Sequence, residues 1–167
     1  MTVDLATVVF GWEKPLGVAD HLLSKVSETA TAQGRSEIEI LEWRLAPDMF
    51  TLAQQFQSVT KLVGEWSARA VGADVPPDLP AEGVGDLRTA ISSTRQYLSA
   101  LSPHQFTHRD EIPLTVDLGL IQPTLATGQW ILGFATTNIL FHLSIAYAIL
   151  RSNGVPLGKP DLFAGGL

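Results

Sequence analysis

Two polar side chains, Asn138 and His142, stand near the end of a run from Leu118 to Leu150 that contains no Asp, Glu, Lys or Arg. On a helix, residues four apart lie on the same face. An uncharged helix in a chain of this size is either a membrane span or the buried element of a helix bundle. In a buried helix an amide and an imidazole cost more free energy than apolar side chains. The pair is therefore the first candidate for a binding or catalytic site.

A carboxylate and a second amide lie on the segment that we expect to form the second long helix. Laid out at about 100° per residue, Asp48 falls near the centre of the apolar stripe of that helix and Gln55 falls on its margin. We expect Asp48 and His142 to face one internal pocket and to act there as acid/base or hydrogen-bonding groups. The positioning groups for a ligand would be Arg44, Gln55 and Asn138.

These residues also have a purely structural interpretation, which stays open. Asp48 in a first helical turn would interact favourably with the helix dipole. Asn138 and His142 would satisfy each other or a neighbouring loop. His104 and His108 have the spacing of a metal-binding pair, but no Glu follows the first His as in the protease motif, so this pair is the weaker candidate.

The composition argues against several classes of protein. The formal net charge is −6 and the sequence has no cluster of Lys or Arg, so we expect no nucleic-acid partner. Without cysteine there is neither a disulfide scaffold nor a thiolate site. The sequence Met-Thr-Val-Asp lacks the basic region before an apolar stretch that an export signal requires. We expect a cytoplasmic protein.

The segment from Trp130 to Leu150 is long enough to span a bilayer. Its polar and small residues lower its hydrophobicity, and no basic cluster flanks it to set an orientation. We therefore expect a buried bundle helix and no membrane partner.

Apolar residues spaced by three and four predict four long helices. Pro15 predicts a kink or a new start near Glu13 in the first helix, and Ser36 with Glu39 predicts a short capped helix. Alternating residues after Pro103 predict a small β-hairpin. The sequence predicts one domain, residues 1–167, with an all-α fold: a four-helix bundle with a long loop and a small β-hairpin between the third and fourth helices. The expected helices run over about 5–30, 47–71, 87–101 and 128–152.

The fourth helix presents two different stripes. The expected core stripe holds Ile131, Phe134, Asn138, His142, Ile145 and Ile149. The opposite stripe carries small and apolar side chains and no charge: Gly133, Thr136, Leu140, Ser144 and Tyr147. A two-fold pairing would bury this face against its own copy, so we expect a symmetric homodimer. The alternative is that the first helix or the C-terminal tail covers the face within one chain.

Two segments carry a resemblance to a known family. They are R-L-A-P-D-M-F (Arg44 to Phe50), followed by Leu52 and Gln55, and F-H-L-S-I-A-Y-A-I-L-R-S-N-G-V-P-L-G-K-P-D (Phe141 to Asp161). Together they resemble an uncharacterised bacterial and fungal family within the DinB/YfiT-like superfamily of four-helix bundles, nearly end to end. The resemblance implies this fold and, because superfamily members are often dimers, agrees with a dimer.

The superfamily usually holds a metal with three histidines, one on the second helix and two spaced as H-x-x-x-H on the last. Several relatives are thiol-dependent transferases or hydrolases. The matching pair is Asn138 and His142, and the second helix offers Asp48 or Gln55 in place of His. Asp, His and an amide make a poor site for a divalent metal.

Three hypotheses follow. The first is a cofactor-free pocket protein, with enzymatic activity left open, that takes a small, partly apolar metabolite. The second is a degenerate metalloenzyme that binds a divalent ion through His142 and Asp48. The third is a non-catalytic dimeric binding or stress-related module.

Overall fold

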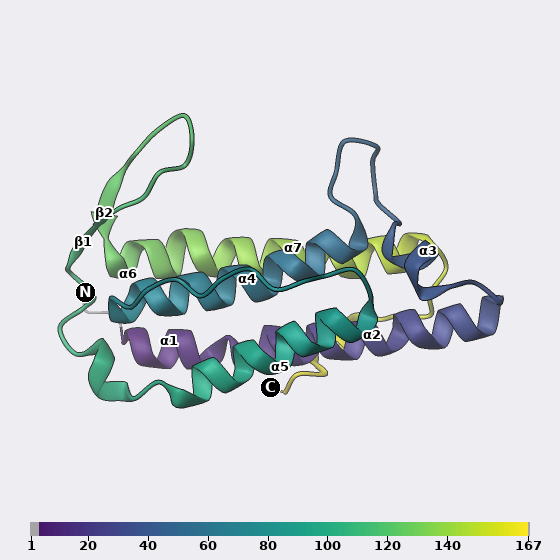
Figure 1. Cartoon of the computed structure of the whole chain (residues 1–167), viewed down its shortest axis with the longest axis horizontal. Helices are drawn as coiled ribbons and strands as arrows, with labels where there is room; N and C mark the ends of the chain where they lie inside the picture. The colour runs from purple at the N-terminus through teal and green to yellow at the C-terminus, as the bar shows by residue number, and fades with distance from the viewer. Residues whose placement is uncertain (1–3, 167) are drawn as a thin grey trace.

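Four long helical segments pack side by side in the computed structural model, which describes residues 4–166 (Figure 1). The first is α1 (Leu5–Gly11) followed directly by α2 (Glu13–Gln33). The short α3 (Glu37–Leu41) leads to α4 (Leu52–Val71) and α5 (Val84–Ala100). The last segment is α6 (Thr127–Gln129), a π-helical turn η2 (Trp130–Ala135) and α7 (Thr136–Ser152). The predicted all-α bundle is confirmed.

Local sequence signals set several helix ends. The chain restarts as α2 at Glu13, as the position of Pro15 predicts. Gly34 and Gly72 end α2 and α4 with φ angles of 62° and 74°, a conformation that glycine adopts without a Cβ clash. Ser36 and Glu39 form the predicted capping box of α3.

The prediction that the second long helix begins at Pro47 is wrong. That helix, α4, begins at Leu52, because Thr51 and Gln54 form a capping box. The Thr51 hydroxyl accepts from the Gln54 backbone N–H at 3.3 Å, and the Gln54 side chain accepts from the Thr51 N–H at 2.9 Å. Once these N–H groups are satisfied, residues 43–51 form a loop instead of a first helical turn.

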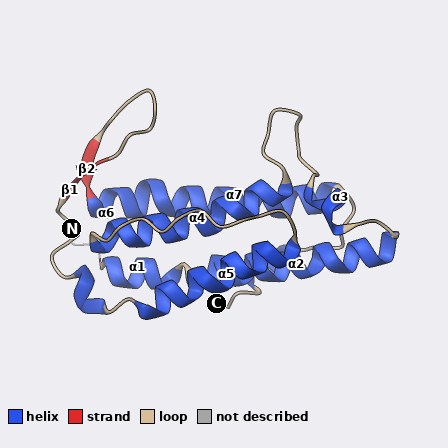
Figure 2. Cartoon of the chain, in the orientation of Figure 1, coloured by secondary structure: helices blue, strands red, loops and turns tan. Residues whose placement is uncertain are grey.

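The two helices α4 and α5 run in the same direction, so the chain between them must return along the bundle (Figures 1 and 2). This loop, residues 72–83, runs along α4 in the direction opposite to that of the helix. A Cβ built on Gly64 would lie 3.3 Å from Pro76 Cγ, and nearer the start of α4 Gln57 Nε2 donates to the Leu79 carbonyl at 3.3 Å. The bundle is therefore not a simple up-and-down form with short turns.

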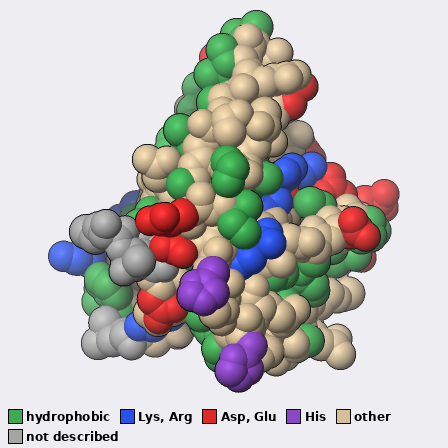
Figure 3. Space-filling model, turned by 90° about the vertical axis from the view of Figure 1, so that its left-hand side faces the viewer, with side chains coloured by type: hydrophobic (Ala, Val, Ile, Leu, Met, Phe, Trp, Pro, Cys, Tyr) green, Lys and Arg blue, Asp and Glu red, His purple; other side chains and the backbone are tan. Residues whose placement is uncertain are grey.

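A small antiparallel hairpin of β1 (Pro113–Thr115) and β2 (Thr124–Ala126) lies between α5 and α6, as predicted (Figure 2). Leu114 pairs with Leu125 in its register. Trp130 Nε1 donates to the Leu114 carbonyl at 2.8 Å and anchors the hairpin to the bundle. Seen from the end of the bundle, the hairpin rises as a narrow projection with hydrophobic side chains on its surface (Figure 3).

The predicted core stripe of the fourth helix is displaced by one residue. The buried stripe comprises Ile131, Ala135, Ile139, Leu143, Ala146 and Leu150, with Ile149 beside it. Phe134, Asn138, His142 and Ile145 are only partly buried. The physical reason is η2: the Thr136 N–H bonds to the Ile131 carbonyl, five residues back, so one extra residue enters the turn. Every later side chain is rotated by about 100° relative to an uninterrupted α-helix.

By length and composition alone, the continuous helix Thr127–Ser152 is long and apolar enough to cross a membrane, a test that core helices of soluble proteins also meet. One stripe of this helix packs into the bundle core. The expectation of no membrane partner stays a prediction.

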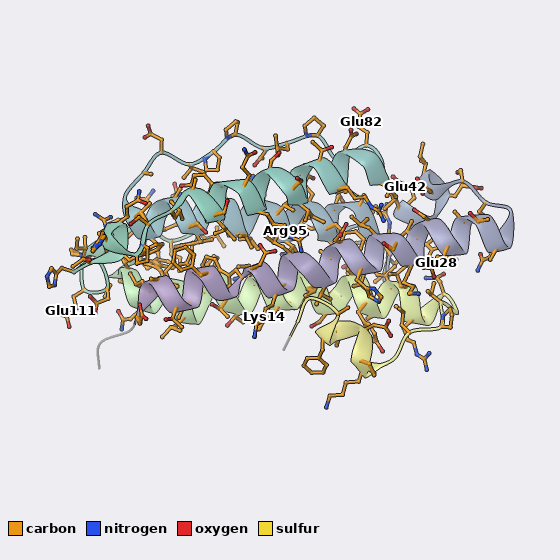
Figure 4. The ribbon with its side chains drawn as sticks, turned by 90° about the horizontal axis from the view of Figure 1, so that it is seen from below. Lys14, Glu28, Glu42, Glu82, Arg95 and Glu111 are labelled. Atoms are coloured by element: carbon orange, nitrogen blue, oxygen red, sulfur yellow. The ribbon has the colours of Figure 1, made fainter. Side chains whose placement is uncertain are left out.

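The C-terminal segment packs back on α2 (Figure 4). Its 3-10 turn η3 (Lys159–Phe163) brings Asp161 within 2.7 Å of His21 Nε2. A Cβ built on Gly17 of α2 would lie 2.7 Å from Gly165 Cα, so the tail touches the backbone of α2 at a position where only glycine fits.

Candidate functional site

The imidazole of His142 on α7 is hydrogen-bonded to the side chain of Gln55 on α4, with 2.7 Å between His142 Nδ1 and Gln55 Oε1. Gln55 Nε2 in turn donates to the Phe50 carbonyl at 3.4 Å, which leaves the amide oxygen to face the imidazole. An amide oxygen only accepts hydrogen bonds, so Nδ1 carries the proton and donates it. Nε2 of His142 is then the unprotonated nitrogen.

Burial lowers the pKa of His142 below its ordinary value of 6.5, so the imidazole is neutral at pH 7. Among residues 4–166, no side chain hydrogen-bonds to its Nε2. Gln55 is only 2% exposed, and the helix pair α4 and α7 holds it in place. The result is a fixed tautomer whose Nε2 lone pair is available to accept a hydrogen bond or a proton.

Two phenylalanine rings flank this imidazole. The Phe50 ring stacks on it with 6.1 Å between centroids and 14° between planes. The Phe141 ring meets it edge-on at 5.3 Å and 79°. Both phenylalanines are 51% exposed, so each still offers an apolar surface next to the imidazole.

Asp48 does not face an internal pocket with His142, and that part of the sequence-based prediction is wrong. Asp48 lies in the loop before α4 and is exposed, because the capping box at Thr51 starts the helix after it. Arg44 is exposed in the same loop, 3.5 Å from Glu42, and lines a shallow hollow with its neighbours Leu45, Ala46 and Pro47.

Asn138 lies one turn before His142 on α7 and is partly buried. Its Nδ2 donates to the Phe134 carbonyl at 2.8 Å, a backbone group of the π-helical turn. This contact favours the structural interpretation of Asn138, since its side-chain amide is already bonded to a backbone carbonyl of the same helix. Of the five predicted site residues, the structure brings Gln55 and His142 together.

Sequence reasoning missed Phe50 and Phe141 as residues of the site. Phe141 adjoins His142 in the chain, and Phe50 ends the R-L-A-P-D-M-F segment, so both were visible in the motifs. The stacking of Phe50 on His142 depends on the loop before α4, and no local pattern predicts that loop.

The side chains around His142 do not make a divalent metal site. Zinc and similar ions take at least three protein ligands, with imidazole and carboxylate preferred over amides. The Gln55 oxygen is engaged by Nδ1–H, and the Asn138 amide is engaged by Phe134. Within residues 4–166 no group of three or more His, Cys, Asp or Glu gathers in a way that suits a metal.

Comparison with known proteins agrees with this architecture. A family described as "Domain of unknown function (DUF1993)" matches residues 6–163. The chain is also similar to the crystal structure of a DinB family member protein from Shewanella denitrificans, with a TM-score of 0.85. The two sequences are 28% identical, and the match covers 95% of this chain and 90% of that chain. None of the curated proteins matches this chain. The predicted resemblance to an uncharacterised, DinB-like family is confirmed.

Proposed function

The chain belongs to the DUF1993 family, and we propose that it binds a small, partly apolar molecule at His142 without a metal cofactor. The observation that carries this proposal is the neutral imidazole, with Nδ1–H held by Gln55 and Nε2 unbonded by any described side chain. A nitrogen in this state accepts a hydrogen bond from a hydroxyl or amine group of a ligand.

The surroundings of His142 favour a ligand with an aromatic or apolar part. Phe50 stacks on the imidazole, Phe141 meets it edge-on, and both remain half exposed, so a bound ring would remove their surfaces from water. Arg44 and Asp48 belong to the same loop as Phe50. We propose that they form a polar rim that orients a charged group of the ligand, and that Asn138 supports the turn beneath His142.

If the ligand is a substrate, His142 is the group that would take a proton, at Nε2, as a general base. Gln55 would keep the Nδ1 proton hydrogen-bonded through the transfer and so hold the ring in one orientation. In a purely binding module the same contacts recognise the ligand and no proton moves.

The test uses phenol, which combines one ring with one hydroxyl donor. Phenol is titrated into protein whose histidines are labelled with ¹⁵N. The Nε2 resonance of His142 should shift and reach a plateau as the site saturates. Phe141→Ala should weaken phenol binding several-fold, because one wall of the site is lost. Phe163→Ala removes a phenylalanine of similar exposure from the C-terminal segment and is the matched control. No shift at Nε2, or equal effects of the two variants, would contradict the proposal.

A second copy of the chain is the partner that the surface of α7 favours. Leu132 and Leu140 are 42% and 49% exposed, and no charged residue interrupts the helix from Thr127 to Leu150. The C-terminal tail packs on α2. The first helical segment covers part of the predicted face, since Trp12 Nε1 donates to the Thr136 hydroxyl at 3.2 Å, but Leu132 and Leu140 remain exposed. Large exposed apolar patches are typical of association surfaces.

The position of two projections also supports a homodimer. The hairpin and the 43–51 loop rise on the same side of the bundle, at opposite ends of α7 (Figure 1). The hairpin carries Leu120 and Ile121, which are 99% and 62% exposed. In a two-fold pair with antiparallel α7 helices, the hairpin of one copy would approach the 43–51 loop of the other. We propose this arrangement for a cytoplasmic homodimer.

A further inference from the structure

A separate cavity of about 190 Å³ lies between α4, α5 and the loop over residues 72–83. It exists because α4 and α5 are parallel and the returning loop roofs the groove between them (Figure 1). Apart from Asp78, which pairs with Lys61, the roof is apolar, with Val75, Pro76, Pro77 and Leu79. Gly64 of α4 forms part of the floor, and Pro76 packs closely over it, so that a Cβ at Gly64 would lie 3.3 Å from Pro76 Cγ.

Tyr97 of α5 lines this cavity, and its hydroxyl is buried without a hydrogen-bond partner among the described residues. Burial raises the pKa of Tyr97, so the hydroxyl remains protonated and able to donate. Two other hydroxyls of the lining, those of Thr60 and Thr94, donate to carbonyls of their own helices at 2.9 Å and 2.8 Å. Ser93, the remaining hydroxyl of the lining, is exposed to solvent. Tyr97 therefore supplies a buried donor that the described residues leave unused.

The cavity has the size of a single-ring molecule. A protein cavity of about 150 Å³ is known to accommodate benzene, so about 190 Å³ takes a six-membered ring with a small substituent. The apolar roof disfavours a charged ligand, because ionic groups lose their hydration there.

The roof is held on the α4 side by contacts that are weak enough to open. Lys61 Nζ lies 2.6 Å from Asp78, and these side chains are 51% and 56% exposed. Exposed ion pairs contribute little stability. A second polar contact is the hydrogen bond from Gln57 to the Leu79 carbonyl, and Pro76 packs on Gly64. A ligand can therefore enter by displacement of the roof.

We propose that this cavity is a binding site for a compact, uncharged, mostly apolar molecule with one hydrogen-bond acceptor, recognised by the Tyr97 hydroxyl. The site is built from α4 and α5 and shares none of its lining residues with the His142 site. It does not depend on the function proposed for His142.

The test compares two probes of similar size, cyclohexanone, which has a carbonyl acceptor, and methylcyclohexane, which has none. Backbone amide NMR shifts report the binding of each. Tyr97→Phe keeps the ring and removes the donor, and Tyr147→Phe makes the same change on α7 as the matched control. The dissociation constant of cyclohexanone should rise about tenfold in Tyr97→Phe only, the worth of one hydrogen bond. Methylcyclohexane should bind both variants like the wild type.

A third variant, Gly64→Leu, fills the floor of the cavity and should abolish binding of both probes. Its helical circular dichroism and the backbone amide spectrum of residues far from the cavity establish that the bundle is intact. If neither probe causes saturable amide shifts in the wild type, the proposal is overturned. An unchanged cyclohexanone affinity in Tyr97→Phe, or full binding to a folded Gly64→Leu variant, would also overturn it.

Discussion

The hydrogen bond between Gln55 and His142 decides which nitrogen of the imidazole is protonated, and it joins residues 87 positions apart. Replacement of Gln55 by Met removes the only described acceptor of the Nδ1 proton. A partly buried donor left unpaired costs about 1–3 kcal/mol of unfolding free energy. Chemical denaturation of Gln55→Met should show a loss in this range. Gln96→Met, at an exposed site on α5, is the control and should change stability by less than about 0.5 kcal/mol.

The lowered pKa of His142 predicts a pH dependence of stability. The unfolded chain takes up this proton near 6.5, whereas the folded protein resists it, so below that pH the unfolded state binds more protons. The contribution of neutral His142 to the free energy of unfolding is complete above about pH 6.5. It is lost as the pH falls through the folded-state pKa of His142. Unfolding free energies of the wild type and His142→Gln, measured between about pH 7.5 and 5.5, should converge at low pH.

The control for this measurement is His104→Gln, which removes an exposed imidazole and leaves the Gln55 contact in place. Because this variant keeps His142 and its hydrogen bond, its unfolding free energy should still fall between about pH 7.5 and 5.5. A His142→Gln curve parallel to that of the wild type would show that His142 titrates equally in the folded and unfolded states.

The metal content of the purified protein distinguishes the metal-free pocket protein from the degenerate metalloenzyme. We expect no stoichiometric zinc or nickel in protein purified without a histidine tag, because both amides near His142 are already hydrogen-bonded. Elemental analysis measures this directly. About one metal per chain, lost in His142→Ala, would favour the metalloenzyme hypothesis instead.

At the scale of elements, the contact between α2 and the C-terminal segment depends on two glycines. An alanine Cβ at Gly17 would lie 2.7 Å from Gly165 Cα and 3.1 Å from Arg95 Nη2. Gly17→Ala should therefore displace the tail and break the contact between His21 and Asp161. We expect about 1–3 kcal/mol of destabilisation and faster amide exchange in residues 158–166.

The matched control is Gly11→Ala, because a Cβ at Gly11 meets no atom within 4 Å. Alanine has the higher helix propensity, so this variant should be as stable as the wild type or slightly more stable. Equal exchange of the tail in both variants would contradict the tight contact at Gly17.

At the scale of the whole molecule, the homodimer is the testable arrangement. Light scattering at micromolar concentration should give about twice the chain mass of 18.0 kDa. Gly133→Arg should split the dimer, because the guanidinium would be buried in an apolar contact without a partner charge. Gly85→Arg places the same charge on α5, where a Cβ also meets nothing within 4 Å, and should leave the dimer intact. A monomeric wild type would contradict the proposal, and an unaffected Gly133→Arg dimer would place the interface elsewhere.

The sequence alone determined the helical segments, the short capped helix at Ser36 and the hairpin before α6, because each depends on neighbours a few residues apart. It also identified Gln55 and His142 as candidates, since both are polar residues on or beside apolar stripes. Two local signals for the start of α4 disagreed. Pro47 is compatible with a first helical turn, but the helix begins after the capping box at Thr51.

Tertiary structure decided the rest. The phase of α7 follows the π-helical turn, which is stabilised by a hydrogen bond from Trp12 Nε1 to the Thr136 hydroxyl at 3.2 Å, across more than a hundred residues. The pairing of His142 with Gln55, and the cavity under the 72–83 loop, follow from which helices lie side by side and in which direction. Periodicity reports which face of a helix is apolar, but the partner of that face is chosen by packing between distant segments.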